Sequence, residues 1–528
     1  MILTMAQAQP QQAGDAVAMA RAALISRPED GELWRALGMA HELGQQFEDA
    51  VAAYERALQL RPEDPAIAGD LGRLAHRLGM LTQAAQLLAA HLQSEPDHPG
   101  STDTLACVLR DQHRHAEAIE LLRGAIGRSP SDQRLWNTLG TVLSAQGDPA
   151  TAATFFEEAL RLEPAYSAAR YNLACARFDL GDTDAAIEGC ELALSQTSDP
   201  AELATIGFAR STMLLCAGRL AEGWEAYEAR FDRDLPDAPI FESLLPRLAP
   251  ERSGEPLLVM AEQGVGDELL FAGVLSELQA DFPEITVAVD PRLAPLFRRS
   301  FPGLRIIAHR TQRLGGRRRR WAPDEPASGA WIPMASLMRR YRRDLADFPD
   351  HPAYLTADPA RVAHWREWLS SLPGRKVGLL WRGGNAVGAR ALQYCPFAEF
   401  EMLLKTPGVS LVNLQYGDSA AEQAAAGEMG VRMHNPPGLD LREDLDDLAA
   451  LCTALDLVIG PANATTNLAG ACGAEVWFLA APMAWTQLGT GRYPWYPRSR
   501  AFTARRQGSW SEAVGDLSAA LAVEAARR

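Results

Sequence analysis

The sequence lacks the clustered positive charge that nucleic-acid binding requires. Its 528 residues carry a formal net charge of −16, whereas a phosphate backbone recruits clustered Lys and Arg. One dense basic run exists, Arg317 to Arg320, and it lies among Gly315, Gly316, Pro323 and Pro326. Those neighbours predict a solvent-exposed loop. We therefore expect no nucleic-acid partner.

Cysteine pairs at metal-binding spacing are also missing. The seven cysteines form no C-x-x-C pair and have no histidine at zinc spacing, which predicts reduced, mostly buried thiols. The N-terminus has neither a basic region nor a continuous apolar segment, and no later stretch approaches about 18 uncharged apolar residues. The sequence therefore predicts a cytoplasmic protein without membrane insertion.

Proline recurs in the first part of the chain at a constant spacing of 34 residues, at Pro28, Pro62, Pro96, Pro130 and Pro164. Between these prolines, small and large apolar residues recur at the same phases, as with Trp34, Gly38 and Tyr54. This pattern is typical of tetratricopeptide repeats, in which small residues let paired helices approach and each proline ends the second helix. The repeat weakens after Leu173, where Ser198 replaces the expected proline.

The repeat array predicts a macromolecular partner. Such arrays form concave surfaces that hold peptides or proteins, and they carry no chemistry themselves. A dimerisation or scaffold role remains the alternative. We expect residues 1–235 to form the array with capping helices, and 236–253 to form a proline-rich linker.

The rest of the chain alternates strand-like with helix-like runs, which indicates parallel sheets. We expect two Rossmann-like domains, at 254–357 and at 358–528, the second including a linking helix and a final helix. Gly264-Val265-Gly266, followed by Asp290, superficially fits a dinucleotide fingerprint, but Leu269 occupies the place of the third glycine. A nicotinamide or flavin enzyme is therefore disfavoured.

Two stretches carry a resemblance to a known family. They are QGVGDELLFAGVL at the start of the first α/β region and LDLVIGPANATTNLAGACGAEVWFL near the end of the second. Together with the repeats, they resemble bacterial tetratricopeptide-linked glycosyltransferases, which are related to heptosyltransferases and O-linked N-acetylglucosamine transferase. The resemblance covers nearly the whole chain and implies a glycosyltransferase B arrangement of the two Rossmann-like domains. Some members of this family modify flagellin.

Asp267 is the candidate catalytic base. It follows a strand on a turn formed by Gln263, Gly264 and Gly266, where the glycines let an acceptor approach the backbone. An inverting transferase needs a base for the acceptor hydroxyl, and the resemblance implies that the Gly266-Asp267 pair supplies it. The alternative is that Asp267 only caps the following helix.

The candidate donor site lies in the second α/β region. Thr465 and Thr466 stand at a predicted helix start, which favours anions, and the resemblance implies that this pair contacts a diphosphate. Other candidates are the cations Arg382 and Arg390 for the phosphate, Asn467 beside the threonines, and Gln415 and Asn463 for the nucleotide. An ordinary helix cap and surface arginines remain the alternatives.

Departures from the family pattern leave the donor open. Ala462-Asn463 replaces the Asp-Thr pair of heptosyltransferases, and Asn467 replaces a histidine. Both a UDP-sugar and a CMP-nonulosonate therefore fit as donor. No D-x-D motif stands where a metal-dependent transferase would need one, since Asp444, Asp446 and Asp447 fit a helix start instead, and this favours chemistry without a metal or other cofactor. The leading hypothesis is an inverting, metal-independent glycosyltransferase that moves a sugar to Ser/Thr hydroxyls of a protein acceptor, such as flagellin, held by the array. The alternative is a catalytically silent scaffold.

Overall fold

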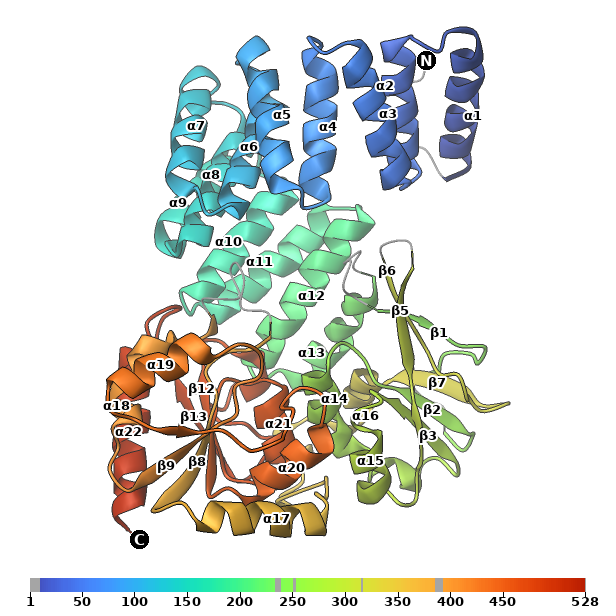
Figure 1. Ribbon diagram of the computed structural model, residues 1–528. Coiled ribbons are helices and arrows are strands. Elements are labelled where there is room, and N and C mark those ends of the chain that lie inside the picture. The colour runs from blue at the N-terminus through green and yellow to red at the C-terminus, as the bar shows by residue number, and fades with distance from the viewer. Residues whose placement is uncertain (1–9, 233–238, 250–252, 315–316, 385–392, 528) are drawn as a thin grey trace. The chain divides into compact units, whose positions relative to one another are not determined.

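A computed structural model describes residues 10–232, 239–249, 253–314, 317–384 and 393–527. The chain forms two compact units, residues 1–176 and 177–528. The first unit is entirely helical in its described part, and the second contains all the described strands. Figure 1 colours the first unit blue to cyan and the sheets of the second green to red.

The first unit is a series of helical hairpins with the predicted repeat length. Its helices are α1 (Pro10–Ser26), α2 (Gly31–Leu43), α3 (Phe47–Leu60), α4 (Pro65–Arg77), α5 (Leu81–Ser94), α6 (Pro99–Asp111), α7 (His115–Arg128), α8 (Gln133–Gln146), α9 (Pro149–Leu162) and α10 (Ser167–Asp179), the last of which crosses into the second unit. The predicted all-helical repeat array is confirmed.

Glycines at one repeat phase allow the close approach of paired helices. A Cβ atom on Gly38 would lie 2.7 Å from the ring of Tyr54. The same substitution at Gly140 would bring a Cβ within 2.5 Å of Phe156. Both aromatic rings are buried. A larger residue at either glycine would therefore clash with the ring packed against it.

A polar ladder joins the first helix of each hairpin to the first helix of the next. Its pairs are 35 residues apart in sequence: Arg35 with Asp70 (2.8 Å), His76 with Asp111 (2.9 Å), Asp103 with Thr138, and Asn137 with Asn172 (2.8 Å). Every rung therefore connects neighbouring repeats, as expected for a solenoid.

The second unit begins with helices that the sequence assigned to the array: α11 (Thr183–Gln196), α12 (Pro200–Cys216), α13 (Leu220–Ala226) and the 3-10 helix η2 (Tyr227–Phe231). Trp224 is fully buried, donates from Nε1 to the carbonyl of Arg342 at 2.8 Å, and meets Phe271 edge-on. The helices α12, α13 and η2 therefore share a hydrophobic core with the α/β region.

The first parallel sheet has the strand order β4-β3-β2-β7. The strands are β2 (Leu257–Met260), β3 (Ile285–Val289), β4 (Arg305–Ala308) and β7 (Ala330–Pro333), with helices α14 (Val265–Phe271), α15 (Ala294–Ser300) and α16 (Met338–Tyr341). β2 is central and wholly buried. The turn between β2 and α14 therefore begins at a strand that is held in place by the core.

A small mixed sheet, β1-β6-β5, corrects two expectations. β1 (Ile240–Glu242) lies in the predicted linker, and β6 (Arg317–Trp321) is the basic run predicted to be a loop; β5 spans Arg310–Leu314. Arg320 is buried and donates to the carbonyl of Ala261 at 2.7 Å. The loop prediction was wrong because charge alone does not reveal that one arginine of the run has buried acceptors.

The second sheet is parallel, with the order β10-β9-β8-β11-β12-β13. Its strands are β8 (Arg375–Leu379), β9 (Val409–Asn413), β10 (Met433–His434), β11 (Leu457–Gly460), β12 (Val476–Ala480) and β13 (Ser499–Thr503). The helices are α17 (Pro359–Ser370), α18 (Glu401–Leu404), α19 (Ala420–Glu428), α20 (Leu445–Ala454), α21 (Ala464–Ala471) and α22 (Ser511–Ala526). The predicted parallel α/β architecture is confirmed.

Other sequence features agree with the structure. All seven cysteines are free, and Cys190, Cys395, Cys452 and Cys472 are buried. Throughout the described ranges, no helix has both the length and the apolar character needed to cross a bilayer.

Candidate functional site

Two turns from the separate sheets meet in the second unit. One follows β2 and leads into α14, and the other follows β11 and leads into α21. Asn467 donates from Nδ2 to the carbonyl oxygen of Gly266 at 3.0 Å. A Cβ on Gly266 would lie 3.3 Å from the backbone nitrogen of Ala464. The structure thus brings the predicted acceptor-side loop to the predicted donor-side helix.

Asp267 lies in the first turn of α14, beside this junction. Its Oδ2 accepts the Gly264 amide at 3.2 Å, so the carboxylate does cap its own turn. Burial raises the pKa of Asp267 to about 6; the Gly264 amide opposes this shift, and the nearby Glu262 and Glu268 add to it. A carboxylate with this pKa is mostly ionised at neutral pH and is a stronger base than an ordinary aspartate.

The loop before Asp267 is held in a strained conformation. Gln263 has φ of 57°, in the left-handed region that non-glycine residues seldom adopt. Its side-chain amide donates to the hydroxyl of Tyr227 at 3.2 Å, and its carbonyl accepts from Arg320 at 3.4 Å. The cap helix η2 and the basic strand β6 therefore fix the predicted acceptor-side loop.

Buried ion pairs that the sequence did not reveal support the same loop. Glu262, directly after β2, accepts two hydrogen bonds from Arg230, at 2.7 and 2.9 Å, and a third from the Ala335 amide at 2.8 Å. Burial opposes the charge of Arg230, but the attraction and hydrogen bonds of Glu262, together with the charge of Glu228, outweigh it and raise the pKa of the guanidinium. The only hint in the sequence was Glu262 itself, a charged residue directly after an apolar strand.

Glu268, the residue after Asp267, belongs to a second buried charge cluster. It is 1% exposed, lies 3.1 Å from His309 Nε2 and 3.6 Å from Arg320, and accepts the Asp290 amide at 2.8 Å. Asp290, which fitted the dinucleotide fingerprint, is instead engaged with Arg292 at 2.9 Å. Asp267 thus lies near two buried carboxylates, Glu262 and Glu268, and each of them is paired with a buried arginine.

The start of α21 satisfies most of its own polar groups. The Oδ1 atom of Asn463 accepts the amides of Thr465 (3.0 Å) and Thr466 (3.2 Å). The hydroxyl of Thr466 donates to the carbonyl of Pro461 at 2.7 Å, and both threonines are buried. An anion at this helix start would therefore have to displace the Asn463 side chain.

Two buried polar atoms beside α21 have no partner within the described chain. They are Nδ2 of Asn463, a donor, and Oδ1 of Asn467, an acceptor. Buried amide groups normally form hydrogen bonds, to protein or to water. One hydrogen-bond donor and one acceptor beside the Gly266 junction are therefore left unpaired within the described chain.

The described residues among the other predicted donor contacts, Gln415 and Arg382, bond to neighbouring protein groups. Gln415 is buried and accepts the amides of Trp381 and Arg382 at 3.1 and 3.0 Å, so it fixes the loop after β8. Arg382 pairs with Glu422 at 3.1 Å and donates to the carbonyl of Asp418. Arg390 lies outside the described residues.

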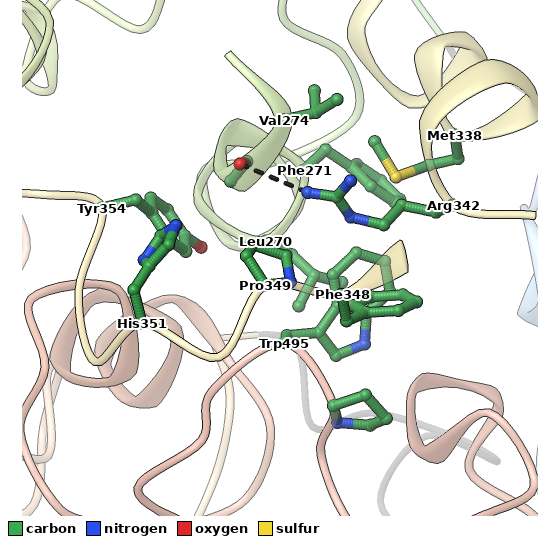
Figure 2. Close-up of a pocket in the computed structure, with 12 residues that line it drawn as sticks. Leu270, Phe271, Val274, Met338, Arg342, Phe348, Pro349, His351, Tyr354 and Trp495 are labelled. Atoms are coloured by element: carbon green, nitrogen blue, oxygen red, sulfur yellow. Dashed lines mark hydrogen bonds between the residues drawn. The ribbon is translucent and has the colours of Figure 1, made fainter. Parts of the chain in front are cut away.

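The cavity in Figure 2 lies at the other end of α14 from Asp267. Phe271, Phe348 and Trp495 line it together with Tyr354 and His351, and Arg342 donates to the Gly273 carbonyl at 3.4 Å. Its volume of about 20 Å³ can hold a water molecule but not a nucleotide sugar. It is therefore not the predicted donor site.

Comparison with known proteins supports the repeat assignment. Two Tetratricopeptide repeat models match this chain, one at residues 41–100 and 143–206 and the other at 11–65 and 104–162. Together the matches cover residues 11–100 and 104–206 and show tetratricopeptide repeats there. Protein FlbA of Caulobacter vibrioides (strain ATCC 19089 / CIP 103742 / CB 15) is 46% identical over 384 residues. The match covers 71% of this chain but only 64% of the length of FlbA.

Solved structures resemble parts of the chain. TTC0263, a thermophilic TPR protein of Thermus thermophilus, is 24% identical over 35% of this chain and 99% of its own, with a TM-score of 0.32. YrrB, described as a TPR protein with an unusual peptide-binding site, is 19% identical over 34% of this chain and 93% of its own, with a TM-score of 0.28. TM-scores this low carry no functional conclusion.

Proposed function

We propose that this chain is an inverting, metal-independent glycosyltransferase that acts on a protein acceptor captured by its tetratricopeptide array. The observation that carries the proposal is the junction between the two α/β turns. It places the Gly266-Asp267 turn against the start of α21, through the Asn467–Gly266 hydrogen bond. In this proposal the acceptor approaches the first turn and the nucleotide sugar binds at the second.

The chemistry assigned to Asp267 is the removal of one proton. Its carboxylate takes the proton from a Ser or Thr hydroxyl of the acceptor while that oxygen attacks the anomeric carbon of the donor. The bond from the anomeric carbon to the phosphate oxygen breaks, and the nucleotide leaves as an anion. The raised pKa of Asp267 suits this role, because a base works best when its pKa lies near the working pH.

The donor contacts in this proposal are those of the second turn. Nδ2 of Asn463 and Oδ1 of Asn467 lack partners within the described chain and would bind the donor. Thr465 and Thr466 would contribute only after Asn463 releases their amides. The UDP-sugar and the CMP-nonulosonate both remain candidate donors, and flagellin remains the candidate acceptor through the resemblance of the sequence.

A scaffold function is the second candidate, and specific contacts favour it. The helix start that should bind phosphate is already capped by Asn463, and the described cation Arg382 is paired with Glu422. A protein with this arrangement could keep the fold and bind a partner through the array alone. Such a scaffold would bind the acceptor without modifying it.

The experiment that separates the two is a transfer assay with the full chain. Purified protein is incubated with flagellin and a panel of UDP-sugars and CMP-nonulosonates, and the intact mass of flagellin is measured. The proposal requires a mass gain of one sugar that disappears in Asp267→Asn while flagellin binding persists. Binding without any mass gain, together with no melting shift for any of these donors, would leave the scaffold function.

A further inference from the structure

The turn between α5 and α6 gathers three metal-ligating side chains that neither the repeat pattern nor the proposed transfer reaction explains. His91 lies near the end of α5, Glu95 follows that helix, and His98 precedes α6. One donor atom from each lies within 4.8 Å of the other two. The cluster falls wholly within the first unit.

His91 is built into the array. Its side chain is 5% exposed, and a Cβ on Gly69 would come within 2.0 Å of its Nδ1. The histidine can therefore occupy this position only because α4 has a glycine opposite it. On the same side of the ring, the Ser101 hydroxyl lies 3.4 Å from Nδ1. If Nδ1 carries the ring proton and donates a hydrogen bond to the Ser101 hydroxyl, the lone pair of the neutral ring lies on Nε2.

Nε2 of His91 is buried and has no hydrogen-bond partner in the described chain. The nearest charge is Oε2 of Glu95, at 3.4 Å. Two ligands bound tetrahedrally at roughly 2.0 to 2.1 Å from a zinc ion lie about 3.4 Å apart. This pair of donor atoms therefore already has the separation that zinc requires.

His98 supplies the third ligand from the exposed side of the turn. Its ring centre lies 4.6 Å from that of His91. In the structure, its Nδ1 accepts the amide of Ser101 at 3.0 Å and so caps α6. A neutral imidazole has a single ring lone pair, so coordination by His98 must release this cap.

We propose that His91, Glu95 and His98 form a zinc site that joins the end of α5 to the start of α6. Two imidazole nitrogens and one carboxylate oxygen are ligands that zinc favours, and three protein ligands leave a fourth position for water. The bound ion would fix the turn between consecutive hairpins. It would thereby set the angle at this point of the array.

The test measures the zinc affinity of the full chain by competition with a chromophoric zinc chelator. The wild-type protein is expected to bind one tight equivalent. Glu95→Gln and His98→Asn should each weaken that binding by at least about tenfold, because each removes one ligand of three. Asn is a good helix cap, so the second variant removes the metal ligand but keeps α6 capped.

His113→Gln/His115→Gln provides a matched control. These two histidines lie in the next turn of the same array, with ring centres 5.9 Å apart, and their loss should leave the zinc affinity unchanged. Equal zinc binding by wild type, Glu95→Gln and His98→Asn would overturn the proposal. So would a loss of tight binding in the control, because that would place the ion at the other turn.

Discussion

The side-chain amide of Asn467 and the backbone carbonyl of Gly266 form a 3.0 Å hydrogen bond between residues 201 positions apart. The bond joins the turn after β2 to the first turns of α21. It fixes the distance between the side chains of these two turns, which are far apart in sequence. A change at either residue therefore acts on both turns.

Replacement of Asp267 with Asn should reduce sugar transfer by about 100-fold to 10,000-fold, the usual contribution of a general base. Wild-type activity should fall on the acid side with an apparent pKa of about 6, because protonation of Asp267 removes the base. Both effects can be measured from initial rates of acceptor modification between about pH 5 and 8. Asp516→Asn, on the exposed face of α22, should leave the rates unchanged.

The same Asp267→Asn change should stabilise the fold near neutral pH. The folded-state pKa of about 6 exceeds the ordinary value of 3.8, so ionisation above pH 6 costs the folded state free energy. The gain should be at most about 3 kcal/mol, reduced by partial exposure, and should disappear as the pH falls through 6 toward 3.8. Chemical denaturation at about pH 8 and about pH 4 measures it, and an equal gain at both would refute the assigned cause.

Gly266→Ala should open the junction. The added methyl would face the backbone of Ala464 and Asn463 at 3.3 to 3.5 Å, and backbone cannot rotate away as a side chain can. We expect a loss of about 1 to 2 kcal/mol in unfolding free energy, together with weaker donor binding. Gly427→Ala is the control, because nothing lies within 4 Å of its added methyl and helix propensity favours Ala.

The two threonines of α21 should respond differently to replacement with Val. Thr466 uses its hydroxyl inside the protein, toward Pro461 and the amide of Asn463, so Thr466→Val should cost about 1 to 3 kcal/mol of stability. If Thr465 contacts the donor, Thr465→Val should weaken nucleotide binding with a smaller loss of stability. Melting curves with and without UDP or CMP measure both, and an unchanged nucleotide response in Thr465→Val would remove that residue from the site.

A fragment that starts at residue 254 should not fold. It would lack Arg230 and leave the buried carboxylate of Glu262 without its cation, a loss worth about 3 to 5 kcal/mol. It would also lack Trp224, which fills the shared core. A fragment of 177–528 retains both residues and should melt cooperatively; cooperative melting of 254–528 as well would contradict this account.

The sequence predicted the fold more fully than the site. Constant proline spacing and alternating buried runs predicted the helical array and both parallel sheets, because repeat period and apolar pattern are local properties. The role of Arg320 could not be predicted, since the Ala261 carbonyl that accepts its hydrogen bond lies near a strand end 59 residues earlier. Likewise, the pairing of Arg230 with Glu262 depends on a helix that the sequence assigned to the array.

At the candidate site, the sequence located the two turns but not their hydrogen bonds. It could not show that Asn463 caps the amides of Thr465 and Thr466, nor that Gln415 binds the backbone of its neighbouring loop. The hydrogen-bond partners of Asn463 lie within three residues of it in sequence. Those of Gln415 lie in the loop after the neighbouring strand, β8. Residue type and position were enough to identify the candidate residues. Whether each one hydrogen-bonds within the protein or to a bound molecule depends on contacts that only the folded structure shows.

The polar ladder of the array determines how a disturbance would spread along it. Because each rung links only consecutive repeats, cooperativity between distant repeats passes through every interface between them. Loss of the Arg35–Asp70 rung would therefore loosen the contact between α2 and α4 first. The Asn137–Asn172 rung would remain closed until the intervening hairpins had opened. The array would thus unfold in stages, one hairpin after another.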